Sequence, residues 1–254
     1  MKLSSWNVNS LKVRLPQVLD WLAADQPDVL CLQELKMEDK VFPLAAIEAA
    51  GYHALFAGQK TYNGVAILTK EKATLVADGI PGFDDPQKRL LAADVAGIRV
   101  VCGYFPNGQA LDSDKYPYKL AWLAALTEWL QTTLAEQPRL ALLGDYNIAP
   151  EDRDADPAAG DCATLVSAEV RAAFQGLLDL GLKDSFRLFE QPEKVWSWWD
   201  YRMMAFRRNM GLRIDHILLS EPLATCCLSS VVDKAPRKLE RPSDHAPVVA
   251  VLDL

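Results

Sequence analysis

Apolar residues along this chain recur in two patterns, short continuous runs and stretches with helical spacing. Short apolar runs bounded by polar residues are typical of buried β-strands. They predict strands at 2–9, 28–34, 65–69, 90–95, 98–104, 140–147, 213–219 and 248–252. Apolar residues three and four apart predict helices at 11–22, 42–50, 119–136 and 168–180.

Residues with strong local preferences mark the boundaries of these elements. Pro27 ends the first predicted helix, and Gly51 and Gly181 end the second and the fourth. Ser167 precedes the fourth helix and is a favoured N-cap residue. The acidic segment 151–162 also contains Pro, Gly and Ala, and this composition predicts a mobile loop.

The order of the elements predicts an α/β fold with mixed sheets. Strands and helices alternate, but not as a regular βαβ series, and the later strands come in pairs. Half of the 254 residues are apolar, enough for one large core, and no linker or low-complexity segment divides the chain. We therefore expect a single domain over residues 1–254. The two halves resemble each other loosely, but too weakly to predict a repeat.

Composition narrows the class of protein. A net charge of −7 argues against a surface that is basic throughout, although it does not exclude a nucleic-acid ligand. The chain lacks the run of about 18 apolar residues that a membrane span requires. Its first residues become polar too early for a secretory signal. Five cysteines without a scaffold spacing, with Cys31 and Cys102 in apolar runs, indicate a reducing cytoplasm.

Five of the predicted strands carry polar side chains at one end. These side chains are Asn7 and Asn9, Glu34, Asp145 and Asn147, Asp215, and Asp244 with His245. Five such endings in one domain predict a shared cleft with several carboxylates and one imidazole. A hard divalent cation would neutralise the clustered carboxylates, and oxygen ligands favour Mg²⁺ or Mn²⁺ over zinc. A cation of this kind beside an imidazole is suited to phosphoryl chemistry.

His245 is one of three histidines and directly precedes the last predicted strand. Neighbouring side chains of an extended segment point to opposite sides, so Asp244 and His245 should diverge. Asp215, a carboxylate within an otherwise apolar strand, is therefore the expected hydrogen-bond partner of the imidazole. By the same alternation His216 should face away from Asp215, and we expect His216 and His53 to be structural.

Seven short motifs in order resemble the exonuclease III family of abasic-site DNA repair enzymes, within the superfamily that includes deoxyribonuclease I. They are WNVN at 6–9, LQE at 32–34, NGVA at 63–66, GYFPN at 103–107, GDYN at 144–147, GLRID at 211–215 and SDH at 243–245. The resemblance spans nearly the whole chain. It implies a four-layered α/β sandwich of two packed mixed β-sheets flanked by helices.

The resemblance also implies an activity. The chain would be a Mg²⁺-dependent phosphodiesterase of base excision repair that cleaves 5′ to abasic sites (AP sites) and processes 3′ ends as an exonuclease and phosphatase. Its partner would be double-stranded DNA with abasic sites or blocked 3′ ends, and it would act as a cytoplasmic monomer. Asn9 stands where some relatives have Asp, and the segment 151–164 matches the family poorly. The number of metal ions and the balance between the activities therefore stay open.

Matching motifs carry roles over to individual residues. Glu34 would be the principal metal ligand, with Asn7 nearby and Asp244 supporting the metal region. Asp145 would orient or deprotonate the attacking water, and Asn147 would hold the water and the phosphate. His245 would contact the scissile phosphate and would be oriented by Asp215. Tyr104 and Asn107 would contact the phosphate as well. Three apolar residues would form a pocket for the flipped-out, base-less sugar, which excludes an intact nucleotide: Trp198, Leu212 and Ile214.

Basic and aromatic residues leave some alternatives open. Arg202, Arg207, Arg208 and Arg213 follow one another without an intervening acid and would form either a solvated face or a ridge that binds the DNA strand. A phosphodiester substrate favours the ridge, which four lysines would extend: Lys36, Lys60, Lys115 and Lys119. Of the three tryptophans at 196, 198 and 199, at most two should face the cleft.

Two other functions fit the same fold. A non-catalytic nucleic-acid-binding regulator would have lost an acid or the histidine from the cluster, and none is lost here. An enzyme for another phosphodiester, such as RNA or a lipid headgroup, is disfavoured by the aromatic pocket and by the match to the repair enzymes.

Overall fold

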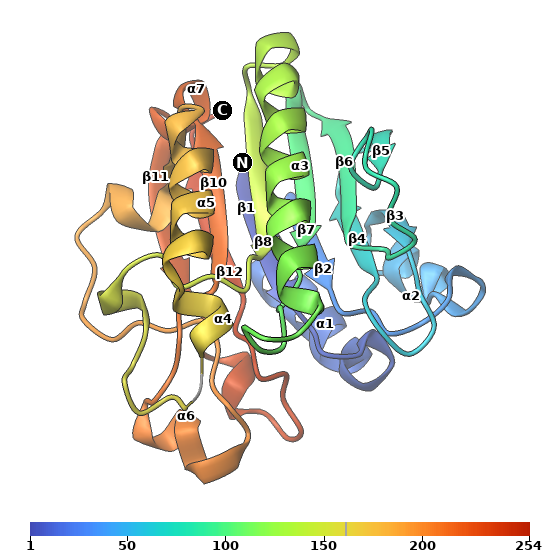
Figure 1. Cartoon of the computed structure of the whole chain (residues 1–254). Helices are drawn as coiled ribbons and strands as arrows, with labels where there is room; N and C mark the ends of the chain where they lie inside the picture. Colours follow the sequence, from blue (N-terminus) through green and yellow to red (C-terminus); the bar gives the residue numbers. More distant parts are fainter. Residues whose placement is uncertain (161) are drawn as a thin grey trace.

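Two β-sheets packed face to face form the centre of the protein in a computed structural model, which describes residues 1–160 and 162–254 (Figure 1). Within those residues each sheet has six strands. In spatial order the first sheet contains β11 (Cys227–Val232), β12 (Val248–Leu252), β1 (Lys2–Asn7), β2 (Val29–Gln33), β4 (Val65–Thr69) and β3 (His53–Ala57). The second contains β5 (Thr74–Asp78), β6 (Leu90–Val95), β7 (Ile98–Tyr104), β8 (Leu140–Asp145), β10 (Asp215–Ser220) and β9 (Leu182–Asp184).

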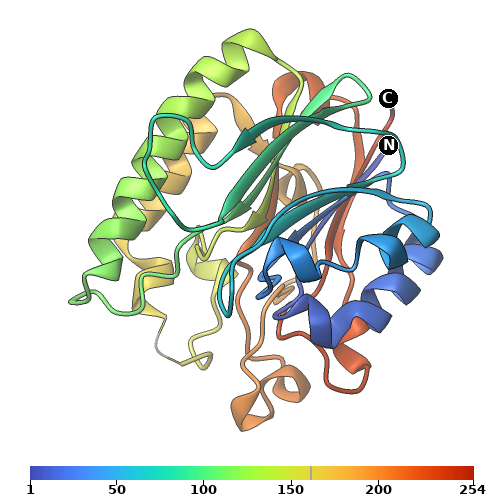
Figure 2. The same cartoon turned by 90° about the vertical axis from the view of Figure 1, so that its right-hand side faces the viewer.

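Helices cover both outer faces and complete four layers, as the two views in Figures 1 and 2 show. The first sheet is covered by α1 (Leu11–Asp25) and α2 (Leu44–Ala49), and the second by α3 (Lys115–Glu136) and α5 (Ala168–Asp179). Apolar side chains fill the three interfaces, and Cys31 and Cys102 are buried in the middle one. The predicted four-layered sandwich is confirmed. The described residues contain three further short α-helices: α4 (Ala163–Val166), α6 (Ala205–Arg208) and α7 (Glu221–Ala224). None of the helices in the described residues is long and apolar enough to cross a bilayer.

Both sheets are arranged around a central parallel pair. β1 and β2 run parallel and are joined through α1, while β7 and β8 run parallel and are joined through α3. The strands that flank each pair are antiparallel to it. This shared order accounts for the loose resemblance between the two halves of the sequence. Since the carboxyl ends of a parallel pair lie at one edge, each sheet delivers two strand ends to the same side of the molecule.

The observed elements differ from the predicted ones mainly at the margins. The sequence pattern does not predict the edge strands β3, β5, β9 and β11, because β9 has only three residues and the other three have no continuous run of buried side chains. β1 and β8 end two residues earlier than predicted, because Asn9 and Asn147 have left-handed φ angles of 44° and 50°. The long helix begins at Lys115 instead of Lys119. Ser167 caps α5 as predicted, accepting a hydrogen bond from the backbone N–H of Val170 at 3.3 Å.

The acidic segment 151–162 is more ordered than its composition predicts. It contains a 3-10 turn at Asp152–Asp154, and the side chain of Asp154 is buried. Position 161 within this segment lies outside the described residues. The prediction of a mobile loop is therefore wrong for Asp154, whose carboxylate is held by Arg213 as described below.

Gly144 lies where β8 passes very close to β7. A Cβ at Gly144 would lie 1.9 Å from the carbonyl oxygen of Gly103. We expect Gly144→Ala to lower the free energy of unfolding by about 3 kcal/mol, because the overpacked strand must move. In the control Gly176→Ala nothing lies within 4 Å of the new Cβ, and alanine stabilises a helix interior by about 0.5–1 kcal/mol. Urea unfolding measures both; an unchanged stability of Gly144→Ala would contradict this account.

Candidate active site

Carboxylates from both sheets meet at one edge of the sandwich through the amide of Asn7. Asn7 Nδ2 donates to Glu34 Oε1 and to Asp145 Oδ2, each at 2.9 Å. Glu34 directly follows β2 of the first sheet, and Asp145 is the last residue of β8 in the second. Asn7 Oδ1 accepts a hydrogen bond from the backbone N–H of Asn9 at 3.0 Å, which fixes the orientation of the amide. One buried amide therefore holds the two carboxylates side by side.

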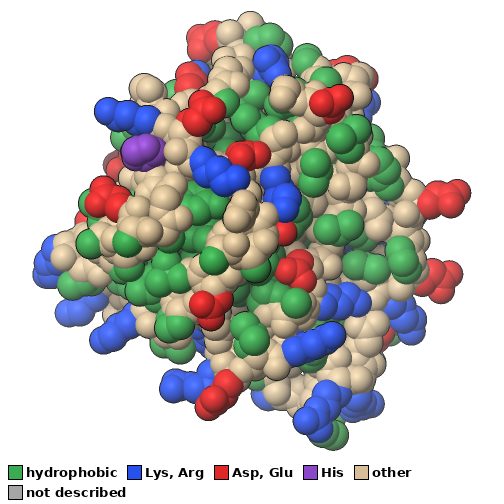
Figure 3. All heavy atoms as spheres, turned by 180° about the vertical axis from the view of Figure 1, so that it is seen from behind, with side chains coloured by type: hydrophobic (Ala, Val, Ile, Leu, Met, Phe, Trp, Pro, Cys, Tyr) green, Lys and Arg blue, Asp and Glu red, His purple; other side chains and the backbone are tan. Residues whose placement is uncertain are grey.

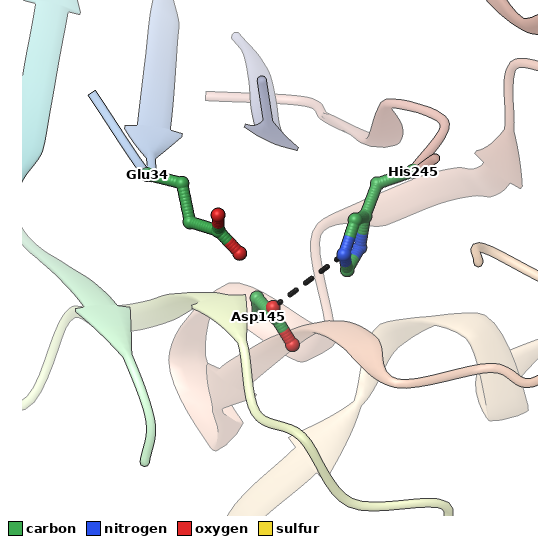
Figure 4. A group of neighbouring side chains, drawn as sticks. All are labelled: Glu34, Asp145 and His245. Atoms are coloured by element: carbon green, nitrogen blue, oxygen red, sulfur yellow. Dashed lines mark ion pairs between the residues drawn. The ribbon is translucent and has the colours of Figure 1, made fainter. Parts of the chain in front are cut away.

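The imidazole of His245 completes this cluster. His245 Nδ1 lies 2.9 Å from Asp215 Oδ2, and Nε2 lies 3.7 Å from Asp145 Oδ2. The side chain of Asp244 points elsewhere and accepts hydrogen bonds from Asn9 Nδ2 and Trp198 Nε1. The expectation that Asp215 and not Asp244 contacts the ring is confirmed. Figure 4 shows Glu34, Asp145 and His245 pointing toward one another.

Burial and mutual charge set the protonation states in this cluster. Burial raises the pKa of Asp145 to about 7, and the negative charges of Asp215 and Glu34 act in the same direction, while His245 opposes them. Burial alone would lower the pKa of His245, but the charges of Asp215 and Asp145 outweigh this effect and raise it to about 10. At neutral pH His245 is therefore an imidazolium with one N–H on Asp215 and the other toward Asp145.

Three further polar side chains line the same edge. Tyr104 at the end of β7 donates its hydroxyl to Glu34 Oε1 at 3.0 Å. Burial, and then the charge of Glu34, raises the pKa of Tyr104 well above its usual value, so the phenol keeps its proton. Asn107 Nδ2 donates to Asn147 Oδ1 at 3.0 Å, and Asn147 Nδ2 donates to the carbonyl oxygen of Phe105 at 3.0 Å. The phenol and the two amides are thus fixed beside the carboxylates.

A cleft of about 810 Å³ opens over these residues. Trp198 and Ile214 contribute apolar parts of its wall. Leu212 is fully buried and pairs with Trp198 through backbone hydrogen bonds of 2.9 and 3.0 Å, so it supports the wall from behind instead of lining the pocket as expected. Trp196 and Trp199 are buried in another apolar cluster. One tryptophan of the three therefore faces the cleft, within the expected limit of two.

The donor atoms in the cluster fit a hard cation. Glu34, Asp145 and His245 each place a potential ligand atom within 4.8 Å of the others. The two carboxylates suit Mg²⁺ or Mn²⁺, whereas the protonated imidazole does not act as a ligand. Glu34 Oε2 also lies 2.8 Å from Lys36 Nζ, which supplies positive charge at the same place.

The other two expected ligands are engaged differently. Asn7 turns its amide nitrogen, a donor, toward both carboxylates, and its oxygen accepts from Asn9. Asp244 lies on the wall of the cleft, with both oxygens accepting hydrogen bonds. The structure therefore assembles the carboxylate pair from Glu34 and Asp145, and places Asn7 and Asp244 around it.

Basic side chains divide into exposed and buried groups. Arg202, Arg207 and Arg208 are exposed around α6, and Arg202 also borders the cleft and pairs with Asp200 at 2.6 Å. Figure 3 shows basic side chains gathered along the lower edge of the molecule, the edge at which α6 lies in Figure 1. Lys60 and Lys115 are exposed as well. Lys119 and Arg213 are buried, so the expectation that they belong to an exposed ridge is wrong.

Comparison with known protein families places residues 4–245 in the endonuclease/exonuclease/phosphatase family. The chain belongs to this family. An exodeoxyribonuclease III of Haemophilus influenzae is 39% identical over 266 residues, covering 98% of this chain and 99% of the relative. A solved 3′ phosphatase from Neisseria, bound to a product DNA hairpin, has a TM-score of 0.96 at 49% identity over 100% of both chains. An AP endonuclease from Archaeoglobus fulgidus has a TM-score of 0.95 at 39% identity, also over 100% of both chains.

These findings confirm the resemblance that the seven motifs indicate. The chain matches the exodeoxyribonuclease III relative over nearly its full length, and its fold is that of the two solved enzymes. The chain is thus a member of a nuclease family, and its relatives include an exodeoxyribonuclease III, a 3′ phosphatase and an AP endonuclease.

Behind its site, this member of the endonuclease/exonuclease/phosphatase family carries a buried ion network that the sequence does not predict. Arg213, 1% exposed, places Nε 2.7 Å from Asp154 Oδ1 and Nη1 2.8 Å from Asp184 Oδ2. Its Nη1 also lies 3.0 Å from His216 Nδ1. The network fixes the segment just before Asp215. The one sequence feature that points to this network is the position of Arg213 directly before an apolar strand, because a buried guanidinium requires carboxylate partners.

His216 faces away from Asp215, as expected. Its Nε2 lies 2.9 Å from the carbonyl oxygen of Ile148 and its Nδ1 faces the guanidinium of Arg213. Because the carbonyl only accepts and the guanidinium only donates, the ring is neutral with its proton on Nε2. Burial, and then the charge of Arg213, lowers the pKa of His216 to about 4. His216 is therefore structural and remains neutral where His245 is charged.

The charge of His245 can be tested through its partner. We expect Asp215→Asn in the metal-free protein to lower the pKa of His245 from about 10 toward the ordinary value of about 6.5, because the largest favourable charge is removed. NMR titration of the imidazole signals measures the change, with Asp152→Asn, an exposed carboxylate, as the control. The stabilisation of the folded state by this ion pair is present below the unfolded pKa and is lost as pH rises through the folded one. An unaltered titration of His245 in Asp215→Asn would contradict the pairing.

Proposed function

We propose that this protein is a Mg²⁺-dependent enzyme that hydrolyses the phosphodiester bond 5′ to an abasic site in double-stranded DNA and also processes blocked 3′ ends. The observation that carries the proposal is the convergence of Glu34, Asp145 and an Asp215-bound His245 within one cleft. The similar exodeoxyribonuclease III, AP endonuclease and DNA-bound 3′ phosphatase support the same substrate class. We expect the enzyme to act as a cytoplasmic monomer, with Cys31 and Cys102 as buried thiols.

Hydrolysis begins at Asp145. A cation held chiefly by Glu34 would supply charge neutralisation for the carboxylates and the phosphate, with Mn²⁺ as a substitute for Mg²⁺. Asp145 orients the attacking water and accepts its proton, a role that suits a carboxylate whose pKa burial raises to about 7. Asn147 holds the water and the phosphate, since it adjoins Asp145 and its backbone N–H donates to Asp145 Oδ1 at 2.9 Å.

Charge that develops on the phosphate oxygens is stabilised by donors fixed before the substrate arrives. His245 presents the N–H of Nε2 into the cluster while Asp215 holds the other side of the ring. Tyr104 provides a hydroxyl donor and Asn107 an amide donor, both from the side of the cleft that the second sheet forms. Preorganised donors of this kind lower the barrier because they need no reorganisation in the transition state.

Substrate choice follows from the shape and charge of the cleft. Trp198 and Ile214 form an apolar wall against which a base-less sugar fits and a complete nucleotide does not. Asp244 orients Trp198 by accepting a hydrogen bond of 3.0 Å from the indole N–H of Trp198. Arg202, Arg207 and Arg208 hold the DNA backbone beside the cleft. A non-catalytic regulator on the same fold is the alternative, and the intact acid–imidazole cluster disfavours it.

The first test compares three DNA substrates in Mg²⁺: an abasic duplex, a nick with a 3′-phosphate and a blunt undamaged end. We expect cleavage 5′ to the abasic site with a 3′-hydroxyl product, and release of the 3′-phosphate. Asp145→Asn and His245→Ala should each reduce the rate by on the order of 10²-fold or more, because the water and the oxyanion lose their partners. His53→Ala, an exposed histidine of β3, is the matched control. Wild-type turnover in both site variants would refute the roles assigned to them.

The second test addresses the cation. We expect Glu34→Ala to raise the Mg²⁺ concentration for half-maximal activity by about tenfold or more, because the cation loses a direct carboxylate ligand. DNA binding in EDTA should change less, which fluorescence anisotropy measures. Glu38→Ala, which removes a partly exposed acid four residues away, is the control. An equal loss in both assays would remove Glu34 as the principal ligand.

A further inference from the structure

Lys119 carries a buried ammonium group directly behind the cleft. It lies in the first turns of α3 and is 0% exposed, whereas lysines rarely bury the charged end of the side chain. Burial lowers the pKa of Lys119 to about 7, and the charge of Asp145 opposes this effect. Lys119 does not line the cleft that holds the reacting groups, so it does not contact the substrate.

The ammonium of Lys119 donates to three backbone carbonyl oxygens from three segments of the chain. They belong to Asn147 at 2.6 Å, Thr164 at 2.8 Å and Asn107 at 3.3 Å. Three acceptors match the three hydrogens of a charged ammonium. The packing is close, because a Cβ added at Gly108 would lie 3.3 Å from Lys119 Cδ.

Two of these carbonyls belong to residues whose side chains enter the cleft. The amide of Asn107 donates to the amide oxygen of Asn147, so the two segments touch at both their side chains and their main chains. Thr164 lies next to Leu165, which forms part of the cleft wall. Asn147 has a left-handed φ of 50°, a conformation that requires support from its surroundings.

The position of this charge is unfavourable for stability alone. Among residues 1–160 and 162–254, no carboxylate lies within ion-pair distance of Lys119 Nζ, and its neighbours are neutral carbonyls. A buried charge without a direct counter-ion is costly, and an apolar side chain of similar length would fill the space without that cost. The charged ammonium has an explanation if it holds the three segments in positions on which the reaction depends.

We propose that Lys119 is a positioning residue that fixes the Asn107–Asn147 amide pair, and through Thr164 the adjoining wall, in the geometry that phosphodiester hydrolysis requires. This inference rests on the proposed function. Lys119 acts through these three segments and not by contact with the substrate, since its own hydrogens are all directed to main-chain oxygens. Its loss should therefore reduce turnover more than affinity for DNA.

The first experiment measures Lys119→Met on the abasic duplex and the 3′-phosphate nick. We expect kcat to fall by on the order of 10–100-fold, because a displacement of about 1 Å at reacting groups has an effect of that size. KM should change by less than about threefold, since the exposed arginines that hold the DNA are untouched. Leu123→Ala, a buried core position on the same helix, is the control for destabilisation alone. A loss of kcat in Leu123→Ala equal to that in Lys119→Met, at matched thermal stability, would overturn the proposal.

A double-mutant cycle separates positioning from a general structural effect. In the Asn147→Ala background the amide pair is already lost, so Lys119→Met should lower kcat by less than about threefold further. Full multiplication of the two losses would overturn the proposal.

Side-chain amide NMR signals of Asn107 and Asn147 give a readout that does not depend on turnover. These signals should shift in Lys119→Met and not in Leu123→Ala, and unshifted signals in Lys119→Met would overturn the proposal. Lys119→Gln replaces Lys119→Met throughout if the latter does not fold. A wild-type protein inactive on both substrates would refute the proposed function instead, because the NMR result stands apart from it.

Discussion

The structure depends on the way in which several negative charges are accommodated at one edge of the sandwich. Glu34, Asp145 and Asp215 come from three strands, and two of them are fully buried. One amide, Asn7, donates to two of these carboxylates, and one imidazolium, His245, lies between the second and the third. Burial, and then the charges of Asp215 and Glu34, raise the pKa of Asp145. The charges of Asp215 and Asp145 raise the pKa of His245 against the effect of burial. Asn7 and His245 therefore offset the negative charge that these three carboxylates bring together.

Topology explains how residues so distant in sequence reach this edge. Each sheet has a parallel pair in its centre, and both pairs direct their carboxyl ends to the same side. Asn7 and Glu34 come from the first pair, and Tyr104 and Asp145 from the second. Antiparallel neighbours then bring Asp215 opposite Asp145, and the segment before β12 brings His245. Loop residues also supply the amides of Asn107 and Asn147, which Lys119 contacts through their main chain.

The sequence predicts the interior of this protein better than its margins. Central strands are continuous apolar runs, so 65–69, 90–95 and 98–104 are found where they are expected. The edge strands, such as β5 with mostly exposed side chains, have no such run and depend on pairing with a neighbour. The same distinction applies to the site. Alternation along strands identifies Asp215 as the partner of His245, whereas no local pattern reveals that Lys119 and Asp154 are buried. For Arg213 the one local signal is its position directly before an apolar strand. Their partners come from other segments, and only the folded chain brings them together.

The two carboxylates joined by Asn7 belong to different sheets, and a middle layer of apolar side chains lies between those sheets. Stacked sheets lie about 10 Å apart, a spacing set by the volume of the side chains between them. Residues of that layer, such as Ile67 and Val100, therefore set the distance between the two carboxylates at the edge of the sheets, although neither belongs to the site. A change in side-chain volume in this layer, far from the cleft, would move Glu34 relative to Asp145. Substitutions at positions that contact no substrate can therefore alter the geometry of this site during evolution.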